Sequence, residues 1–524
     1  MSRTMTSTRP DATDPAAPTA GADAFGLAGR RTPIELDPAD FAEMGHRLVD
    51  DVAALLERMR TGPLTPGETP DQVRARLDAG AGLPEQGTDA AELLRETTAM
   101  LADHSLYNGH PRFFGYITAG AAPIGVLGDL LAAAVNPNLG AWTLSPMASE
   151  IEDQAIRWIA ELVGYPAGDG VLTSGGNVAN MLGFWAARAS RAGWEVREAG
   201  MRADEATGLR VYAPAGTHTW IQKAADLSGL GAASIRWIEA DEGGRIRIDR
   251  LREAVRADRD AGARPFLVVG TGGSVATGAV DDLGALRALC DEHDLWLHVD
   301  GAYGAFAAAA SNAPEELREL ALADSVALDP HKWLYAPLEA GCTLVRDPTA
   351  LLGAFSYRPD YYHFDGAGKN FFEHGIQNSR GFRALKVWLQ LRQVGRAGYA
   401  RMIEQDIELA RSFHRIAAGR DTLEALGHGL SVTTYRVVPP DLAARADEPD
   451  VLAWLNDLNR EVQLRMERGG EAFVSNAVLG DVYALRMCVV NFRTALEDVV
   501  ALADISERLG REVDAELRPA SLRA

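Results

Sequence analysis

Residues 323–337 read ADSVALDPHKWLYAP, a stretch that brings a lysine to the end of an apolar strand. The run 325–328 predicts a buried strand, Pro330 ends it, and Lys332 occupies the turn beyond. Apolar residues 333–335 follow, so Lys332 starts from a buried setting. Burial lowers the pKa of a lysine and makes the neutral amine available for a Schiff base. A lone lysine on a loop is nearly always just solvated, so this stretch taken alone only suggests a functional lysine.

A second strand ends on a carboxylate in LWLHVDGAYGAF, residues 295–306. Asp300 follows a very apolar run, where an ionised side chain needs a cationic partner. A protonated ring nitrogen of a bound cofactor is such a partner, and it would let the ring accept electrons from a substrate carbanion. The small residues Gly301 and Ala302 would let a flat ring lie against the backbone. The alternative is an aspartate that caps the following turn.

Two further turns carry groups that suit a bound anion or ring. In VLTSGGNVANMLG, residues 171–183, a strand passes through the Gly-rich turn 174–177 into a helix. Free N–H groups and the helix dipole form an anion site there. In YAPAGTHTWIQKAADLSG, residues 212–229, His218 follows a strand and opens a helix. A single histidine in that position is more often a structural cap than a catalyst.

The alternation of apolar runs and helical stretches between residues 111 and 395 predicts a large α/β domain. Seven short runs are interpreted as strands: 170–173, 210–213, 234–238, 265–270, 295–300, 325–328 and 342–346. Buried runs joined by helices favour a mainly parallel seven-stranded sheet with helices on both faces. Ligands of such sheets gather beyond the carboxyl ends of the strands.

Three further regions flank this domain. Residues 1–36, rich in Ala, Thr, Pro and Asp, are interpreted as a disordered tail. Residues 37–110 form an N-terminal helical segment, with helices expected from Pro38, at 70–77 and at 89–104. These helices are too few to form a core alone, so we expect them to pack against something else, such as a partner subunit. Residues 396–524 form a small C-terminal α/β domain, with expected elements at 395–418, 430–436, 482–491 and 496–517.

The composition excludes several classes of function. A net charge of −21 repels nucleic acid and anionic membranes, and no run approaches the ~20 apolar residues of a membrane span. The start of the chain lacks an apolar signal core. The cysteines, Cys290, Cys342 and Cys488, fit no metal-ligand spacing and are interpreted as buried, reduced thiols. We therefore expect a cytoplasmic protein that binds neither nucleic acid nor membrane and holds no metal.

The order of these motifs resembles that of the fold-type I pyridoxal 5′-phosphate (PLP) decarboxylases, specifically the aromatic-L-amino-acid decarboxylase-like group II. The resemblance spans about residues 105 to 495. It rests on HPRFFGY (110–116), LSPMASEIE (144–152), TSGGNVAN (173–180), AGTHTW (215–220), VVGTGGSVATG (268–278), HVDGAYG (298–304), DPHKW (329–333), GAFSYRPDYY (353–362) and RGFRALKVWLQLR (380–392). It implies the fold-type I transferase fold and PLP as the cofactor.

The resemblance also implies roles for individual residues. Lys332 matches the lysine of the Schiff base, and Asp300 matches the partner of the pyridine nitrogen. His218 matches the histidine that stacks on the ring and assists proton transfer, and Ala302 packs on the other ring face. The other cofactor positions match the phosphate turn, a threonine beside the cofactor, and two residues near the phosphate and reaction centre: Ser174, Gly175, Gly176, Asn177, Thr271, Ser325 and His331.

The family has a mobile loop after the lysine, with a tyrosine that protonates the product carbanion. Counting from Gly353 places this tyrosine at Tyr361, with Tyr362 as the adjacent alternative. Gly366 and Gly368 are consistent with a lid. In the family this loop reaches the neighbouring subunit's site. The resemblance therefore implies a homodimer with shared active sites, in which the N-terminal helices serve as the dimerisation layer.

Two departures from the family bear on the site. Its animal members have Asn where this chain has Asp329, and a carboxylate near the phosphate would be repulsive unless it is turned away or paired. The substrate wall is also reshaped, because Asn138 and Gly140 stand where aromatic-specific members have bulky side chains. Tyr116 and Ala119 complete the candidate substrate pocket, Ala119 near the place of a family threonine.

These assignments predict a PLP-dependent carboxy-lyase that converts an L-amino acid to its amine and CO2 through a Lys332 Schiff base. Whether the amino acid is aromatic stays open. One alternative is decarboxylation-dependent oxidative deamination, which gives an aldehyde. Relatives reach that chemistry when the lid tyrosine or the stacking histidine changes, and both Tyr361 and His218 are present here. A second alternative is a non-catalytic scaffold on a PLP fold.

Overall fold

The computed structural model describes residues 30, 32–201, 208–358 and 368–523. The expected tail at 1–36 therefore lies almost entirely outside the described residues, and so do Tyr361, Tyr362 and Gly366. The chain divides into two compact units. One consists of Met1–Leu55 and Pro84–Met100, and the other of Leu56–Leu83 and Leu101–Ala524.

The N-terminal segment forms the three expected helices, α1 (Pro38–Thr61), α2 (Pro70–Leu77) and α3 (Ala90–His104). Thr69 and Gln72 form a reciprocal capping box at the start of α2, which explains its sharp beginning. None of the three helices buries a residue. This agrees with the expectation that they do not build a core of their own.

A seven-stranded sheet forms the centre of the second unit. Its strands are β1 (Asp169–Thr173), β2 (Leu209–Pro214), β3 (Ile235–Ile238), β4 (Arg264–Thr271), β5 (Trp296–Asp300), β6 (Ser325–Leu328) and β7 (Gly341–Val345). The order is β1-β7-β6-β5-β4-β2-β3, with β7 antiparallel to both neighbours and the other pairs parallel. All seven predicted strands are confirmed, each with bounds within one residue.

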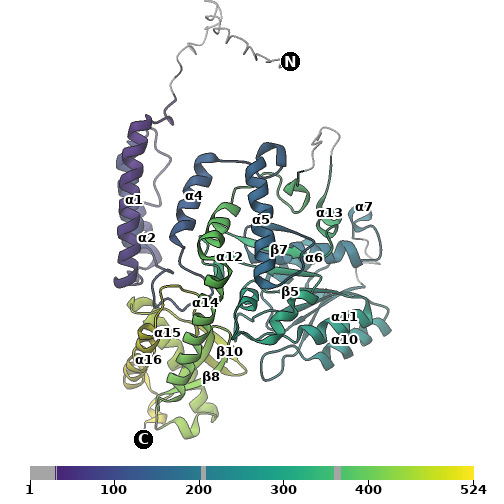
Figure 1. Cartoon of the computed structure of the whole chain (residues 1–524). Helices are drawn as coiled ribbons and strands as arrows, with labels where there is room; N and C mark the ends of the chain where they lie inside the picture. Colours follow the sequence, from purple (N-terminus) through teal and green to yellow (C-terminus); the bar gives the residue numbers. More distant parts are fainter. Residues whose placement is uncertain (1–29, 31, 202–207, 359–367, 524) are drawn as a thin grey trace, which may run out of the picture. The chain divides into compact units, whose positions relative to one another are not determined.

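Helices precede, connect or cover the strands of this sheet. They are α4 (Pro123–Val135), α5 (Pro146–Val163), α6 (Gly176–Arg191), α7 (Val196–Ala199), α9 (Trp220–Leu227), α10 (Ile248–Asp260), α11 (Leu283–His293), α12 (Pro330–Trp333) and α13 (Ala350–Phe355). Helix α6 packs on five of the strands, while α10 and α11 lie side by side against β3, β4 and β5 (Figure 1). Strands buried on both faces explain the near-continuous apolar runs of the sequence.

The C-terminal part of this unit forms a second, antiparallel sheet of order β10-β11-β9-β8. Its elements are α14 (Ala384–Ala418), β8 (Leu423–Gly429), β9 (Val432–Val437), α15 (Pro449–Gly469), β10 (Ser475–Leu479), β11 (Val482–Cys488) and α16 (Leu496–Leu517). Helix α14 begins before the expected start at 395, because two helices follow each other across Gly395, where φ is 67°. Strands β8 and β10 were not predicted.

Short 3-10 helices complete the secondary structure of the described residues: η1 (Trp142–Leu144), η2 (Ala232–Ser234), η3 (Ala305–Ala309), η4 (Glu315–Leu322), η5 (Phe371–Glu373), η6 (Ala443–Arg445) and η7 (Ala520–Leu522). Within the described ranges, no helix combines the length and the apolar character needed to cross a membrane.

Candidate active site

A cavity of about 270 Å³ lies beyond the ends of β4, β5 and β6. Eight candidate residues from distant parts of the sequence share its wall: Tyr116, Gly176, Asn177, His218, Thr271, Asp300, Ala302 and Lys332. Ser174, Gly175 and His331 adjoin these residues in the chain. Among the described residues, the other four candidates are not part of the wall: Ala119, Asn138, Gly140 and Ser325.

Lys332 lies in the short helix α12, directly after strand β6. Its Nζ is 3.0 Å from Oδ2 of Asp329, which is buried. The carboxylate that departs from the family pattern is therefore paired with the lysine. The other oxygen of Asp329, Oδ1, is buried and accepts no hydrogen bond from the described part of the chain.

The buried carboxylate of Asp406 holds the residues that follow Lys332. Asp406 Oδ2 accepts hydrogen bonds from Trp333 Nε1 at 2.8 Å and from the Tyr335 hydroxyl at 2.7 Å. Trp333 also stacks on Tyr303, with ring centroids 5.1 Å apart. Burial raises the pKa of Asp406 to about 7. Sequence reasoning missed Asp406, because a single Asp within a long amphipathic helix gives no signal.

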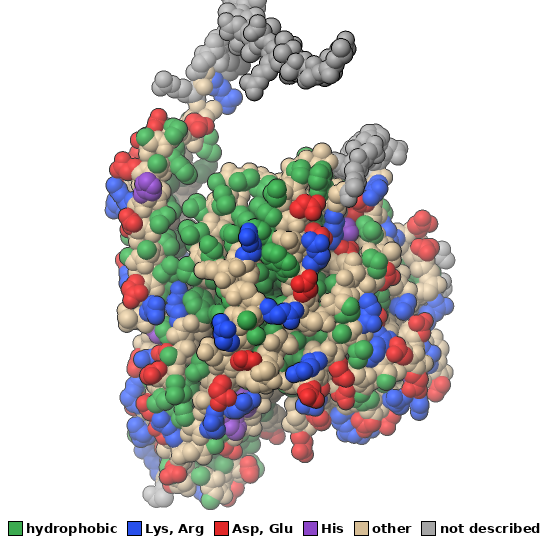
Figure 2. Space-filling model, in the orientation of Figure 1, with side chains coloured by type: hydrophobic (Ala, Val, Ile, Leu, Met, Phe, Trp, Pro, Cys, Tyr) green, Lys and Arg blue, Asp and Glu red, His purple; other side chains and the backbone are tan. Residues whose placement is uncertain are grey.

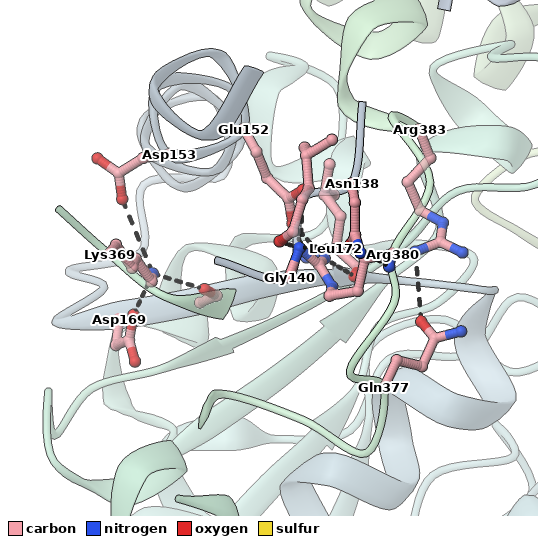
Figure 3. Close-up of polar contacts among 12 residues, drawn as sticks. Asn138, Gly140, Glu152, Asp153, Asp169, Leu172, Lys369, Gln377, Arg380 and Arg383 are labelled. Atoms are coloured by element: carbon pink, nitrogen blue, oxygen red, sulfur yellow. Dashed lines mark hydrogen bonds and ion pairs between the residues drawn. The ribbon is translucent and has the colours of Figure 1, made fainter. Parts of the chain in front are cut away.

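Lys332 differs from the other lysines of this chain. The sequence contains four lysines: Lys223, Lys332, Lys369 and Lys386. Lys223 is exposed, Lys369 pairs with Asp153 and Asp169 (Figure 3), and Lys386 pairs with Asp129. Lys332 alone of the four is part of the cavity wall.

Asp300 ends strand β5 with its carboxylate held by two donors. Trp220 Nε1 donates to Oδ2 at 2.7 Å, and the backbone N–H of Ala302 donates to Oδ1 at 3.2 Å. Trp220 is fully buried and also forms part of the cavity wall. The carboxylate therefore has a fixed orientation while it faces the cavity.

His218 lies at the exposed mouth of the cavity, two residues before helix α9. Its Nδ1 accepts a hydrogen bond from the backbone N–H of Trp220 at 3.3 Å. Partial burial lowers the pKa of the imidazole, against the opposing effect of Asp300. Because Nδ1 is the acceptor, the neutral ring carries its proton on Nε2.

The glycine turn before α6 has the shape required for a backbone anion site. Gly175 has φ of 121°, which L side chains rarely adopt. A Cβ on Gly176 would lie 2.4 Å from Asp329 Oδ2 and 3.0 Å from the Ala302 Cβ. The amide oxygen of Asn177 is buried and has no hydrogen-bond partner within the described ranges. Both glycines are therefore required here, and the N-terminus of α6 faces the cavity.

A buried network connects Ser325 to this turn without bringing it to the cavity. Ser325 Oγ lies 2.8 Å from His298 Nδ1, and His298 Nε2 lies 2.8 Å from Asn180 Oδ1. Asn180 Nδ2 in turn donates to the Gly176 carbonyl at 2.8 Å. Burial lowers the pKa of His298 to about 4, so the ring is neutral at pH 7. Ser325 thus supports the glycine turn through His298 and Asn180.

A buried ion pair holds the strand that enters the glycine turn (Figure 3). Arg380 donates to Glu152 and to the Leu172 carbonyl, and Glu152 Oε1 accepts from the Leu172 N–H at 3.2 Å. Asn138 Oδ1 accepts from the backbone N–H groups of Arg380 and Gly140. Asn138 and Gly140, which were predicted to contact the substrate, therefore support the segment around Arg380. A Cβ on Gly140 would meet the Asn378 carbonyl at 2.2 Å.

Ala119, like Asn138 and Gly140, contacts other parts of the protein. It is buried, and its carbonyl accepts a hydrogen bond from Asn108 Nδ2 at 3.0 Å. As substrate contacts, Ala119, Asn138 and Gly140 stay predictions.

One charged group of the cavity wall was not predicted from the sequence. Arg486 on β11 is buried, donates from Nε to Ser475 Oγ at 2.9 Å and also donates to the Val275 carbonyl. No carboxylate of the described residues pairs with it. Burial lowers the pKa of this guanidinium. The cavity therefore contains an arginine that lacks a negative partner.

Comparison with known proteins identifies the family. A model of the pyridoxal-dependent decarboxylase conserved domain matches residues 70–426. The aromatic-L-amino-acid decarboxylase of Bacillus atrophaeus is 30% identical over 486 residues, covering 92% of this chain and 97% of the relative. Cysteine sulfinic acid decarboxylase of Homo sapiens is 29% identical over 453 residues, covering 85% and 90%. The chain belongs to the pyridoxal-dependent decarboxylases.

A solved structure supports the same conclusion. The crystal structure of Oryza sativa TDC with PLP and tryptamine aligns with a TM-score of 0.84 at 27% identity, covering 92% of this chain and 100% of that one. The fold is therefore that of the fold-type I PLP enzymes, as predicted. The protein is a PLP-dependent carboxy-lyase.

The residues of the cavity fit PLP. The N-terminus of α6 and the glycine turn offer backbone donors to a phosphate. Asp300 offers a fixed carboxylate to the ring nitrogen, and Lys332 offers the amine that this class of enzyme requires. His218 and Ala302 are available to the two ring faces. When bound, PLP supplies a conjugated ring that accepts the electrons of a breaking bond at Cα.

Proposed function

We propose that this protein decarboxylates an L-amino acid to the amine and CO2, with Lys332 holding the cofactor through Nζ. The observation that carries this proposal is the meeting of Lys332, Asp300 and His218 on one cavity wall beside the glycine turn. A scaffold without activity would not need to keep a partly buried lysine, a fixed carboxylate and an oriented imidazole together.

The chain's own residues then have separable roles. Asp300, held by two donors, keeps the proton on the ring nitrogen and so maintains the electron-accepting form of the cofactor. His218 presents Nε2–H at the mouth of the cavity, where it can hold a proton near the substrate. Tyr361 returns a proton to Cα in this proposal, as the resemblance implies, although it lies outside the described residues.

Arg486 is proposed to bind the substrate carboxylate. A buried guanidinium without a carboxylate partner is unfavourable in the empty site and becomes favourable when an anion arrives. Arg486 lines the cavity, and its buried guanidinium pairs with no carboxylate of the described residues.

We also propose a cytoplasmic homodimer. Helix α4 packs on α14 but leaves apolar side chains exposed, and hydrophobic atoms gather over the region of α4 in Figure 2. These side chains are Leu127, Leu130, Leu131 and Val135, each more than half exposed. An apolar helix face of this kind favours burial against a partner. Three free, buried cysteines suit a reducing compartment.

The experiment that tests the function is a panel of L-amino acids given to the holoenzyme. Carbon dioxide, amine, aldehyde and peroxide are measured for each amino acid. The proposal expects equal amounts of CO2 and amine from at least one substrate, without peroxide. Aldehyde with peroxide would favour the oxidative alternative, and no turnover of any amino acid would favour the scaffold.

A further inference from the structure

Trp220 contacts two of the residues that the proposed function uses. Its indole Nε1 donates to Asp300 Oδ2 at 2.7 Å, and its backbone N–H donates to His218 Nδ1 at 3.3 Å. Asp300 and His218 come from different elements, and both face the same cavity. One residue therefore orients the carboxylate and selects the protonated nitrogen of the imidazole.

The residues around Trp220 hold its indole ring in one orientation. Trp220 has no exposed surface, and its ring packs edge-on against Phe184 at 6.5 Å and against His298 at 5.6 Å between centroids. These contacts fix the plane of the ring and hence the direction of its single N–H donor. The first residue of α9 is thus locked before any ligand binds.

From these contacts we infer that Trp220 is a positioning residue for the reaction, acting through Asp300. The indole N–H holds the carboxylate in the orientation that faces the ring nitrogen, and it favours the ionised carboxylate over a neutral one. The ring proton then stays on the cofactor nitrogen. The inference rests on the proposed function, because it assigns Asp300 to that nitrogen.

The two contacts of Trp220 can be separated by substitution. Trp220→Phe removes the indole N–H but keeps the backbone donor to His218. The variant should therefore resemble a partial loss of Asp300 and leave the role of His218 unchanged. Trp185→Phe is a matched control, because Trp185 also donates from Nε1, to Ser228 Oγ at 2.9 Å, and packs edge-on against Phe355, away from the cavity wall.

The experiment uses holoenzyme reconstituted with PLP labelled with ¹⁵N at the ring nitrogen. The wild-type protein and Trp185→Phe should show the chemical shift of a protonated ring nitrogen. In Trp220→Phe the chemical shift should move toward that of a neutral ring nitrogen. The kcat should fall by roughly tenfold to hundredfold, as when other residues that orient an active-site group through a hydrogen bond are removed, with little change in KM. A wild-type nitrogen shift and wild-type kcat in Trp220→Phe would overturn the inference.

A double-mutant cycle distinguishes positioning from a structural role. In an Asp300→Asn background, Trp220→Phe should cause no further loss of kcat, because the contact it removes no longer serves an ionised carboxylate. Losses that multiply in the two backgrounds would show that Trp220 acts only through packing, and would contradict the inference.

A second replacement covers the case in which Trp220→Phe does not fold. Benzothienylalanine at position 220 keeps the shape of the indole and replaces its N–H with sulfur. It should reproduce the nitrogen shift and the loss of kcat, and full activity would refute the inference. Because the nitrogen shift needs only bound cofactor, a wild-type protein that binds PLP but turns over no amino acid would reject the proposed function. The nitrogen shift of the Trp220 variants would still decide the role of Trp220.

Discussion

At the scale of single residues, the charges in the cavity explain the chemistry better than its shape does. Lys332 pairs with Asp329, and Asp300 is held by Trp220, so each of these two groups has a fixed place. Arg486 is different, because it faces the cavity and pairs with no carboxylate among the residues that the structure describes. In the proposed function, the carboxylate of the incoming amino acid supplies that partner.

Substitution of Arg486 tests this account of substrate binding. Arg486→Gln removes the charge while keeping a donor for Ser475. Charge-assisted hydrogen bonds contribute about 1.5–3 kcal/mol, so kcat/KM should fall roughly tenfold to hundredfold, mainly through a higher KM. Steady-state kinetics measure this change. Arg436→Gln removes a buried arginine of the neighbouring strand β9 and is the control for lost stability. Equal kinetics in wild type and Arg486→Gln would contradict the assignment.

The sequence predicted Lys332, Asp300 and His218 because each lies at the end of a strand or at the start of a helix, where a motif can be recognised. It did not predict Arg486 or Asp406, since each is a single charged residue within a regular element. Ser325 was expected near the reaction centre, but its hydroxyl contacts His298 and Trp296. The alternation of residues along a strand does not show which of the two buried faces of the sheet a side chain such as that of Ser325 lies on.

At the scale of elements, helix α14 fixes the segment after Lys332. Asp406 accepts hydrogen bonds from Trp333 and Tyr335, and Tyr335 has φ of 57°, which is unfavourable for a tyrosine. The fully buried contacts compensate for that backbone strain. A helix from the C-terminal part of the chain thereby holds the loop of Lys332.

Asp406 predicts a pH dependence of stability. Its pKa rises from an ordinary 3.8 to about 7 on folding, because burial disfavours the charge. The folded protein therefore binds the proton more tightly, and the stabilisation from this group is complete below pH 4 and lost as the pH rises through about 7. Relative to wild type, Asp406→Asn should gain stability between pH 4 and 8, by an amount on the order of a few kcal/mol.

Thermal unfolding at several pH values measures this difference. Asp457→Asn, on the exposed face of α15, should show a difference from wild type that does not change with pH. A flat difference for Asp406→Asn would mean that this carboxyl group is ionised at no free-energy cost, contrary to the account.

The elements that sequence analysis missed have a physical explanation. Strand β8 contains two glycines and is only half buried, and β10 alternates between buried and exposed residues over just five positions. Neither gives a continuous apolar run. Except for β3, the strands of the large sheet are buried throughout most of their length, so their apolar runs were unambiguous. Helix α16 was predicted with its observed bounds, since its apolar residues recur at helical spacing over six turns.

At the scale of the whole molecule, the exposed apolar face of α4 predicts self-association. The holoenzyme should elute at about twice the mass of one chain, because two copies can bury this face against each other. Leu130→Arg combined with Leu131→Arg should convert it to a monomer, as measured by light scattering. Val478→Arg, on another exposed position, is the control. A wild-type protein that is monomeric at micromolar concentration would contradict the homodimer.

The central claim is that Lys332 carries the cofactor, and the small number of lysines makes it directly testable. Holoenzyme is reduced with borohydride and digested, and the phosphopyridoxyl group is located by mass spectrometry. The account predicts the label on Lys332 and on none of Lys223, Lys369 and Lys386. Label on one of those three residues, or none on Lys332 in a protein that shows the visible absorbance of bound PLP, would contradict it.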